Sequence, residues 1–495
     1  MQAKSRLFRF YEWLPGGLIW STFVLSLIFS FWKPIWVIYF IIAFDLYWLF
    51  RVLHFILLAS LSYFKYKKTA QINWLDKVKQ LPNWQRIYHI IYLPTYGEPT
   101  EVLETTFKSL CASNFPIKQM IIVLGGEGRE DAAFRERAEK VKQQFAEKFS
   151  HFLVTVHPDG LADEIRGKGA NANWMGHRSQ EVIDELKIPY DDLIVSYFDC
   201  DTCVHPEYFS HLTYRYLTHP TPTRVSFQPA VNYNNNIWNA PAAMRVTAFG
   251  TIFWLLMDLM RPDRLYTFSS HSMSFRALTD VGFWQKDIVT DDSRIFLQCF
   301  FRYNGEYAVE PMYIPVSMDT VMDKNYWQGF KNLYKQQRRW AWGVEHFPYM
   351  MEHFKGNKGI PWLTKLKYTW NLTEGMYSWA TAPVLIFVLG RLPLYIAGHG
   401  EQSTSVIVQN APFVLEKLML AAMIGIFFSA VVSMLILPPR PDNQPRWKYA
   451  VMFLQWALLP ITLILFGSIP ATEAQTRLML PEKYHLGFFV TPKVR

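Results

Sequence analysis

The stretch LIVSYFDCD, residues 193–201, decides the predicted fold. It opens with a mostly apolar run that is typical of a buried β-strand, and Asp199 and Asp201 follow this run directly. In an open α/β sheet, ligands bind at the carboxyl ends of the strands. The two carboxylates therefore stand where a functional site is expected, although an acidic turn by itself is more often a solvated loop.

Residues 86–227 repeat this pattern. Short β-rich runs alternate with amphipathic helical stretches, which is typical of a mostly parallel sheet with helices on both faces. We therefore expect an α/β fold for this part of the chain. The predicted strands cover residues 87–93, 119–124, 152–156, 193–198 and 224–227.

Long apolar runs lie at both ends of the 495-residue chain, whereas its middle is polar and charged. Such runs predict helices that cross a membrane. We expect a transmembrane helix pair at residues 1–64, the α/β domain at 65–360, a transmembrane bundle at 361–480 and a tail at 481–495. The apolar runs cover residues 18–31, 35–53, 376–397, 418–437 and 449–467.

Basic residues flank the first two runs, and by the positive-inside rule we expect the α/β domain in the cytoplasm. The expected membrane is the plasma membrane. The loop at 398–414 has no Lys or Arg and is expected outside, whereas the basic loop at 438–448 is expected inside. A full span at 449–467 would put the basic tail outside. We expect Pro460 to break this run into a re-entrant or interfacial element, with a cytoplasmic tail. The basic residues concerned are Lys4, Arg6, Arg9, Lys65, Lys67, Lys68, Arg477, Lys483, Lys493 and Arg495.

Charge and cysteine content exclude some classes of protein. The net charge of +9 does not indicate a nucleic-acid partner, because no basic cluster lies on a recognisable nucleic-acid module. The four cysteines make no disulfide framework for a chain of this length, and we expect free thiols in a reducing compartment. Cys200 and Cys203 form a C-x-x-C pair, but no second pair stands at zinc spacing.

Two further motifs carry chemistry. Thr290, Asp291 and Asp292 precede a predicted helix, where they suit either helix capping or, for one carboxylate, general-base catalysis. QQRRW at 336–340 places an amide, a guanidinium that binds phosphate and an indole that stacks on sugar rings on one helical turn. The carboxylates of the D-x-D at 199–201 suit Mg²⁺ or Mn²⁺ bridging a diphosphate.

The order of these motifs resembles that of the processive membrane-bound family-2 glycosyltransferases, the group of cellulose, chitin and hyaluronan synthases. The series is PTYGE at 94–98, RGKGAN at 166–171, DCD at 199–201, TDD at 290–292 and QQRRW at 336–340. The resemblance implies a GT-A-like domain between transmembrane helices, Mg²⁺ or Mn²⁺ as cofactor, and inverting transfer from a nucleotide sugar, either a UDP- or a GDP-sugar. The implied partners are a saccharide or lipid-linked acceptor and membrane lipids.

The resemblance also implies which residues bind the donor. Lys168 should lie near the donor phosphates, and Gln336 and Arg339 should hold the diphosphate. The tail FFVTPK at 488–493 is similar to the segment that closes over the donor in cellulose synthases. The residues implied beside the nucleotide base and ribose are Thr95, Tyr96 and Glu98.

Catalytic and acceptor roles follow from the same resemblance. Asp199 and Asp201 should serve the nucleotide sugar and the metal, and Asp292 should be the general base. Trp340 should hold the acceptor end, with Asp291 beside it.

Three positions depart from the family pattern. GGE at 125–127 replaces an acidic pair after the second strand, so Glu127 is a candidate substitute in base recognition. Asp291 stands where the family has a glutamate. SSHSMS at 269–274 replaces the acceptor loop of small residues, and His271 is a candidate acceptor contact, with a structural or solvated histidine as the alternative.

Several alternatives stay open. Asp45 and Arg51 interrupt the second apolar run, which suits a hydrated saccharide path or, for the arginine, snorkelling to the interface. The stretches 240–260 and 326–354 suit interfacial or ordinary buried helices. For the activity we favour processive polysaccharide synthesis. The alternatives are a single transfer to a lipid or polyprenyl phosphate and a non-catalytic binder, which the intact acidic motifs disfavour.

Overall fold

An eight-stranded sheet forms the centre of the domain between the apolar ends, in a computed structural model that describes residues 5–492. The strand order is β3-β2-β1-β4-β7-β6-β8-β5. β1 pairs in parallel with β2 and β4, whereas β7 runs antiparallel to both β4 and β6. The strands are β1 (Tyr88–Pro94), β2 (Met120–Glu127), β3 (His151–His157), β4 (Leu193–Tyr197), β5 (Cys203–Val204), β6 (Val225–Tyr233), β7 (Ser272–Ser274) and β8 (Ala308–Met318).

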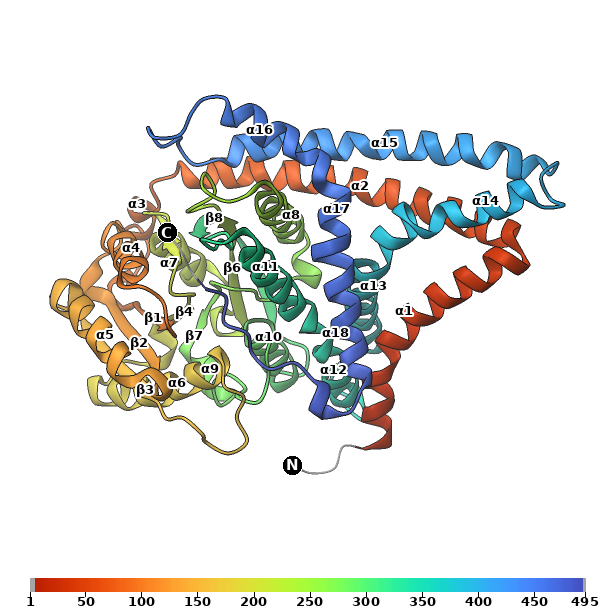
Figure 1. The fold of residues 1–495 in the computed structure, drawn as a ribbon. Helices are drawn as coiled ribbons and strands as arrows, with labels where there is room; N and C mark the ends of the chain where they lie inside the picture. The colour runs from red at the N-terminus through yellow and green to blue at the C-terminus, as the bar shows by residue number, and fades with distance from the viewer. Residues whose placement is uncertain (1–4, 493–495) are drawn as a thin grey trace.

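Each predicted strand overlaps a strand of the structure, and the predicted α/β fold is confirmed. Helices cover both faces of the sheet. Alternate residues of a strand point to opposite faces, and both sets of side chains are apolar here, so each face needs a cover. In β1, Ile90 and Tyr92 join one core while Ile91 and Leu93 join the other. The covering helices include α4 (Thr100–Cys111), α5 (Asp131–Phe145), α6 (Lys168–Leu186), α7 (Tyr208–Thr218), α9 (Phe275–Asp280) and α10 (Asp291–Arg302) (Figure 1).

Five helical segments among residues 5–492 are long and apolar enough to cross a membrane. Four of them contain predicted spans or closely match them: α1 (Arg6–Trp32), α2 (Pro34–Ala70), α15 (Val406–Ile436) and the continuous run Lys448–Met479. The predicted span at 376–397 is divided between α13 (Trp362–Phe387) and α14 (Leu392–His399), which are bent by 45° to each other.

The fifth segment, α8 (Ala242–Leu259), lies against the sheet and α2. Its Ile252, Phe253 and Leu256 belong to the core that also contains the β1 residue Ile90, so the buried alternative holds for this stretch. Residues 326–354 form α11 (Tyr326–Ala341), a 3₁₀ turn at Trp342–Glu345 and α12 (His346–Phe354).

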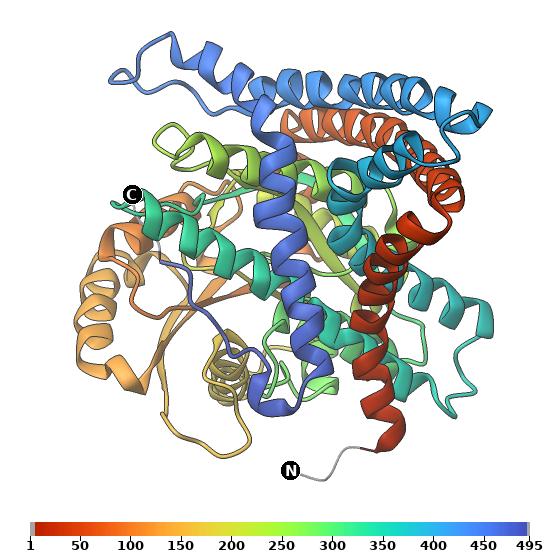
Figure 2. The ribbon, with the colours of Figure 1, turned by 45° about the vertical axis from the view of Figure 1, so that its right-hand side comes forward.

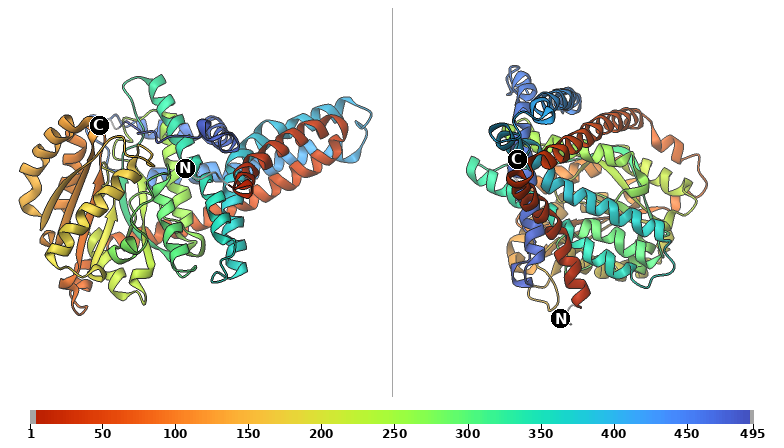
Figure 3. Two further views of the ribbon diagram at one scale, coloured as in Figure 1. Left: turned by 90° about the horizontal axis from the view of Figure 1, so that it is seen from below. Right: turned by 90° about the vertical axis from the view of Figure 1, so that its right-hand side faces the viewer.

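α1, α2, α14 and α15 extend away from the sheet domain as an arm (Figure 3, left). The α1–α2 turn and the loop between α14 and α15 lie together at its far end, where Ile38, Ala397 and Val408 pack together. The basic loop after α15 instead lies against the sheet domain, where Lys448 Nζ donates to the carbonyl of Trp238 at 2.7 Å. The two loops predicted on opposite sides of a membrane therefore lie at opposite ends of the arm.

The last apolar run does not follow the arm to its far end (Figure 2). A 3₁₀ turn at Gln455–Leu458 precedes Pro460, and a π-helical turn follows at Ile464–Ser468, but the run stays helical to α18 (Ile469–Met479). α18 packs against α1, α11 and α13. After α18, a 3₁₀ turn at Glu482–Tyr484 is followed by an extended segment that crosses the sheet domain (Figures 1 and 2). This tail therefore lies at the sheet domain and not at the far end of the arm.

Candidate active site

A lysine and two aspartates from three separate elements meet at the end of β4. Lys168, the first residue of α6, places its Nζ 2.7 Å from Asp199 Oδ1 and 2.9 Å from Asp292 Oδ1. The same Nζ lies 3.9 Å from the centre of the Tyr197 ring. Burial opposes the charge of Lys168, but the neighbouring carboxylates outweigh it and raise the pKa of this lysine. The ammonium group therefore stays charged at neutral pH.

Asp291 lies buried beside this cluster. Its Oδ2 accepts a hydrogen bond of 2.6 Å from the hydroxyl of Tyr197. Burial, together with the charge of Asp292, raises the pKa of Asp291 to about 7, although Lys168 opposes the shift. Asp291 therefore changes charge near neutral pH, next to the predicted general base.

The two D-x-D carboxylates have different surroundings. Asp199 is partly exposed and also accepts a 2.7 Å hydrogen bond from the Ser269 hydroxyl. Asp201 is fully buried, and its Oδ2 accepts from the backbone N–H of Asp319 at 2.8 Å. Within residues 5–492, no three His, Cys, Asp or Glu side chains are grouped closely enough to hold a metal ion. The hard carboxylate oxygens suit Mg²⁺ or Mn²⁺ only if phosphate or water oxygens complete the coordination shell.

The turn after β1 is organised by Glu98. The hydroxyl of Thr95 donates to Glu98 Oε2 at 2.6 Å, and the backbone N–H of Tyr96 donates to the same oxygen at 2.5 Å. Burial raises the pKa of Glu98, and these two donors oppose the shift. The Arg129 guanidinium lies 3.8 Å from the centre of the Tyr96 ring. Tyr96 thus links this turn to Arg129, in the segment that follows β2.

Glu127, at the end of β2, is buried and already has partners. Its Oε2 lies 3.4 Å from His157 Nδ1, and His157 Nε2 lies 2.8 Å from Glu164. Burial would lower the pKa of His157, but the two glutamates outweigh burial and raise it. A role for Glu127 in base recognition therefore requires these contacts to rearrange.

His271 is fully buried between β4 and β7. Its Nδ1 donates to the carbonyl of Phe268 at 2.9 Å, and its own carbonyl accepts from the backbone N–H of Tyr197. Burial lowers the pKa of this histidine to about 4, so the ring is neutral. The ring packs against Tyr197 of β4 with ring centres 5.7 Å apart, and this burial leaves no exposed surface of His271 for an acceptor.

The residues of QQRRW lie on the last turns of α11, where the C-terminal tail passes over this helix at Phe488. Gln336 is buried, and Trp340 packs on Tyr233 with ring centres 5.6 Å apart. The Arg339 guanidinium lies 4.7 Å from the ring centre of Phe488. A Cβ at Gly167 would come within 2.8 Å of the Phe488 Cβ.

Phe488 therefore lies between α11 and the residue that precedes Lys168, which places the tail over the lysine cluster. Lys493, the end of the tail motif, lies outside the described residues.

Comparison with known proteins identifies the family. Residues 194–469, more than half of the 495-residue chain, match the family described as "Glycosyl transferase family group 2". The chain belongs to this family. It is therefore a glycosyltransferase. No curated protein matches this sequence.

Solved structures with a similar backbone share little sequence with this glycosyltransferase. A mannosyltransferase from Pyrobaculum calidifontis in complex with GDP-Man and Mn2+ is 12% identical, with a TM-score of 0.42, covering 82% of this chain and 99% of its own. TarS 1-349 of S. aureus in complex with UDP-GlcNAc is 9% identical, with a TM-score of 0.36, covering 72% of this chain and 98% of its own.

The structure also brings residues to the site that sequence analysis missed. Tyr197 and Ser269 contact Asp291 and Asp199 respectively. Both lie in stretches that the sequence marks, the strand at 193–198 and the loop at 269–274, but no site role was predicted for either. Glu345 accepts a hydrogen bond from the backbone N–H of Thr290 at 3.0 Å. Only its position five residues after Trp340 connects it to a motif.

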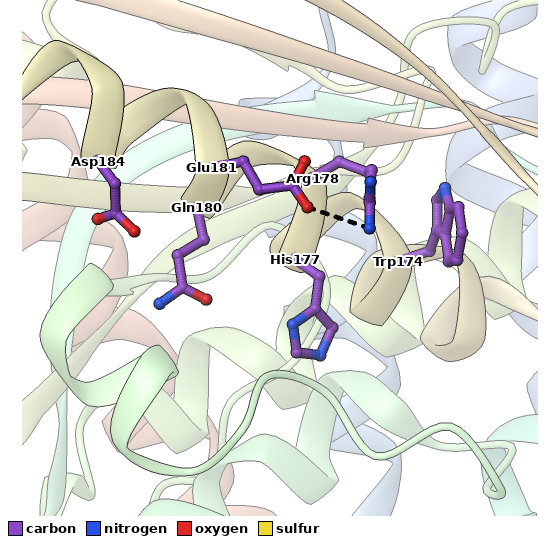
Figure 4. Close-up of a pocket in the computed structure, with 6 residues that line it drawn as sticks. All are labelled: Trp174, His177, Arg178, Gln180, Glu181 and Asp184. Carbon is purple, nitrogen blue, oxygen red and sulfur yellow. Dashed lines mark ion pairs between the residues drawn. The ribbon is translucent and has the colours of Figure 1, made fainter.

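A surface hollow lies elsewhere, on α6. It has a volume of about 360 Å³ and follows one exposed face of α6, which begins at Lys168 (Figure 4). An ion pair of 3.1 Å between Arg178 and Glu181 lies within it. None of the predicted donor, acceptor or metal residues lines this hollow. Its lining residues are Trp174, His177, Arg178, Gln180, Glu181 and Asp184.

Arg51, the arginine in the second apolar run, is paired within the protein. Its guanidinium lies 3.2 Å from Glu374 Oε1 on α13, which also accepts from the Tyr47 hydroxyl at 3.0 Å. Arg264 approaches the other oxygen of the same carboxylate to 3.8 Å. Arg51 thus faces a protein carboxylate, and this pairing alone accounts for a charge in an apolar helix.

Proposed function

We propose that this protein transfers a sugar, with inversion, from a nucleotide-sugar donor to a saccharide acceptor. The observation that carries the proposal is the position of Lys168 between Asp199 and Asp292. A buried ammonium group at the carboxyl end of a strand suits a diphosphate, and a carboxylate beside it suits proton transfer. Binding of the diphosphate to Lys168 would weaken its pairing with Asp292 and leave that carboxylate able to accept a proton.

The proposed reaction is a single displacement. The acceptor hydroxyl gives its proton to Asp292 while its oxygen bonds to the anomeric carbon of the donor sugar. The bond from that carbon to the diphosphate oxygen breaks on the opposite face, and its electron pair leaves with the nucleoside diphosphate. Lys168 and Arg339 would bind the developing negative charge. Attack opposite to the leaving group inverts the configuration.

Asp199 and Asp201 are the proposed ligands of Mg²⁺ or Mn²⁺. The donor set fits a hard cation, although Asp199 pairs with Lys168 and Asp201 accepts from a backbone N–H. When bound, the cation would stabilise the diphosphate as a Lewis acid.

The remaining predicted residues would bind the ends of the two substrates. Thr95, Tyr96 and Glu98 share one hydrogen-bonded turn after β1, and Gln336 and Trp340 lie on the last turns of α11 beside Arg339, which supports this assignment. Thr95, Tyr96 and Glu98 would form the nucleotide site, whose donor would be a UDP- or GDP-sugar. Gln336 would help to hold the diphosphate, and the acceptor residues would be Trp340, Asp291 and His271.

We further propose that the product is a growing polysaccharide and that synthesis is coupled to membrane passage. The long apolar helices and the position of Trp340 at the end of α11 support this proposal, because one helical turn would hold the donor diphosphate and the acceptor ring together. In this arrangement the sheet domain would be cytoplasmic and the plasma membrane would hold the arm. A single transfer to a lipid-linked acceptor is the alternative.

Incubation of the purified protein with a panel of UDP- and GDP-sugars tests the donor class. Release of nucleoside diphosphate together with sugar incorporation into product supports transfer. Product length at low enzyme occupancy then separates the two acceptor classes. Long chains without short intermediates support processive synthesis, whereas one sugar on a lipid under all conditions favours single transfer.

A further inference from the structure

Glu345 lies outside the predicted motifs, but its side chain reaches back to the turn that carries the proposed general base. It ends the 3₁₀ turn after α11. Its Oε1 accepts from the backbone N–H groups of Thr290 at 3.0 Å and Val289 at 3.3 Å, and also from the Thr290 hydroxyl. Its Oε2 accepts from the indole N–H of Trp342 at 2.9 Å. One carboxylate thus accepts from four donors, three of which lie in the distant segment at Val289 and Thr290.

A second set of contacts ties the same two segments together. Arg294 Nε donates to His346 Nδ1 at 3.1 Å, so the proton of the neutral imidazole lies on Nε2, which donates to the Ser293 hydroxyl at 2.7 Å. Burial and the charge of Arg294 hold the pKa of His346 well below its usual range, which keeps the ring neutral. Arg294 also donates to the carbonyl of Glu345 at 3.3 Å.

Apolar packing joins the turn before α10 and the 3₁₀ turn after α11 to the long helices. Val289 is fully buried together with Trp342 and Val344. The same cluster contains Ala380 of α13 and Ala474 of α18. The turn before α10, the end of α11 and the helical bundle therefore form one packed unit, in which Glu345 makes the polar contacts.

We propose that Glu345 is a positioning residue that holds the Thr290–Asp292 turn in register with Arg339. The proposal rests on the proposed function, in which Asp292 accepts a proton while Arg339 binds the diphosphate. Both groups act on one reacting centre, so their separation has to be fixed. A charged carboxylate with several N–H donors gives stronger and shorter hydrogen bonds than a neutral acceptor. A misplacement of about 1 Å can lower a rate by about 10²-fold.

Kinetics of three variants test this role. Glu345→Ala removes all four contacts and should lower kcat by about 30-fold while the donor KM stays within about twofold, because Asp292 is displaced but the nucleotide site is not. Glu345→Gln keeps one acceptor oxygen and should recover part of the loss. The control Asp280→Ala removes a 2.7 Å hydrogen bond from Tyr303 at the opposite end of α10. It should change neither constant by more than about twofold.

Equal losses in Glu345→Ala and Asp280→Ala, or a Glu345→Ala kcat within twofold of the wild type, would overturn the proposal. If Glu345→Ala does not fold, Thr290→Val removes the hydroxyl that donates to Glu345 and also lies 3.3 Å from His346 Nε2. It should still lower kcat several-fold at constant donor KM, and an unchanged kcat would contradict the role. Failure of the proposed function looks different, because the wild type would then turn over no nucleotide sugar.

Discussion

Lys168 and Asp292 are joined by an ion pair of 2.9 Å, although 124 positions separate them in the chain. The lysine begins α6 and the aspartate lies in the first turn of α10, so the sheet is what brings them together. Asp199, which follows β4, binds the same ammonium group. The residues proposed for donor binding and for proton transfer therefore share one buried charge.

Replacing this lysine should harm both binding and stability. Lys168→Met leaves two partly exposed carboxylates without their common cation, which should lower the free energy of unfolding. Thermal unfolding should therefore begin at a lower temperature, and titration calorimetry should show weaker binding of UDP or GDP. Lys142→Met, which alters an exposed lysine of α5, serves as the control and should change neither. Unchanged nucleotide affinity in Lys168→Met would remove Lys168 from the donor site.

Asp201→Ala should abolish metal-dependent transfer. The diphosphate would lose Lewis-acid stabilisation worth several kcal/mol, roughly 10³-fold or more in rate. Transfer measured across a titration of Mn²⁺ checks this result, with Asp131→Ala, which alters a partly exposed carboxylate of α5, as the control. Full wild-type activity in EDTA would argue against a metal at this site.

The tail should act on donor closure. Phe488 lies against Arg339 and close to Gly167, so Phe488→Ala and deletion of residues 489–495 should both raise the donor KM, because a lid excludes water and orders the phosphates. Tyr484→Ala, at an exposed position before this contact, is the matched control. Wild-type KM in both tail variants would show that the tail is not a lid. Cysteine labelling of the tail only from the side opposite the sheet domain would reject the proposed topology.

Turnover should rise with pH through about 7. The raised pKa of Asp291 means that this residue is mostly neutral below that pH and mostly charged above it. A charged Asp291 favours proton transfer to the carboxylate beside it, since a nearby negative charge favours protonation. In Asp291→Asn the rise near pH 7 should disappear, whereas Asp287→Asn, at an exposed position of the loop before it, should keep it. An identical profile in Asp291→Asn would assign the titration to another group.

The strands could be predicted from sequence because each carries its own apolar run. β4 begins at the predicted residue, and β1 differs by one residue at each end from the predicted run at 87–93. β5, β7 and β8 were not predicted, and β5 has only two residues. β7 has only three residues, and β8 alternates buried and partly exposed positions over eleven residues that include two prolines.

The candidate site residues could be named from sequence only where a motif marks them, and their roles stay predictions. Lys168, Asp199 and Asp292 each belong to a motif, but nothing local in the sequence indicates that one ammonium group lies between both acids. The contacts of Tyr197 and Glu345 depend on tertiary packing across distant segments. The last apolar run resembled a span in composition, and only its packing against α11 and α1 shows where it lies.

The central claim is inverting transfer with Asp292 as the base, and the anomeric configuration of the first product tests it most directly. Proton NMR of the product formed by the wild-type protein should show the configuration opposite to that of the donor sugar. Asp292→Asn should bind the donor nearly as well and form no product at a measurable rate, because a general base contributes about 10² to 10⁴-fold. A retained configuration, or turnover by Asp292→Asn at the wild-type rate, would contradict the account.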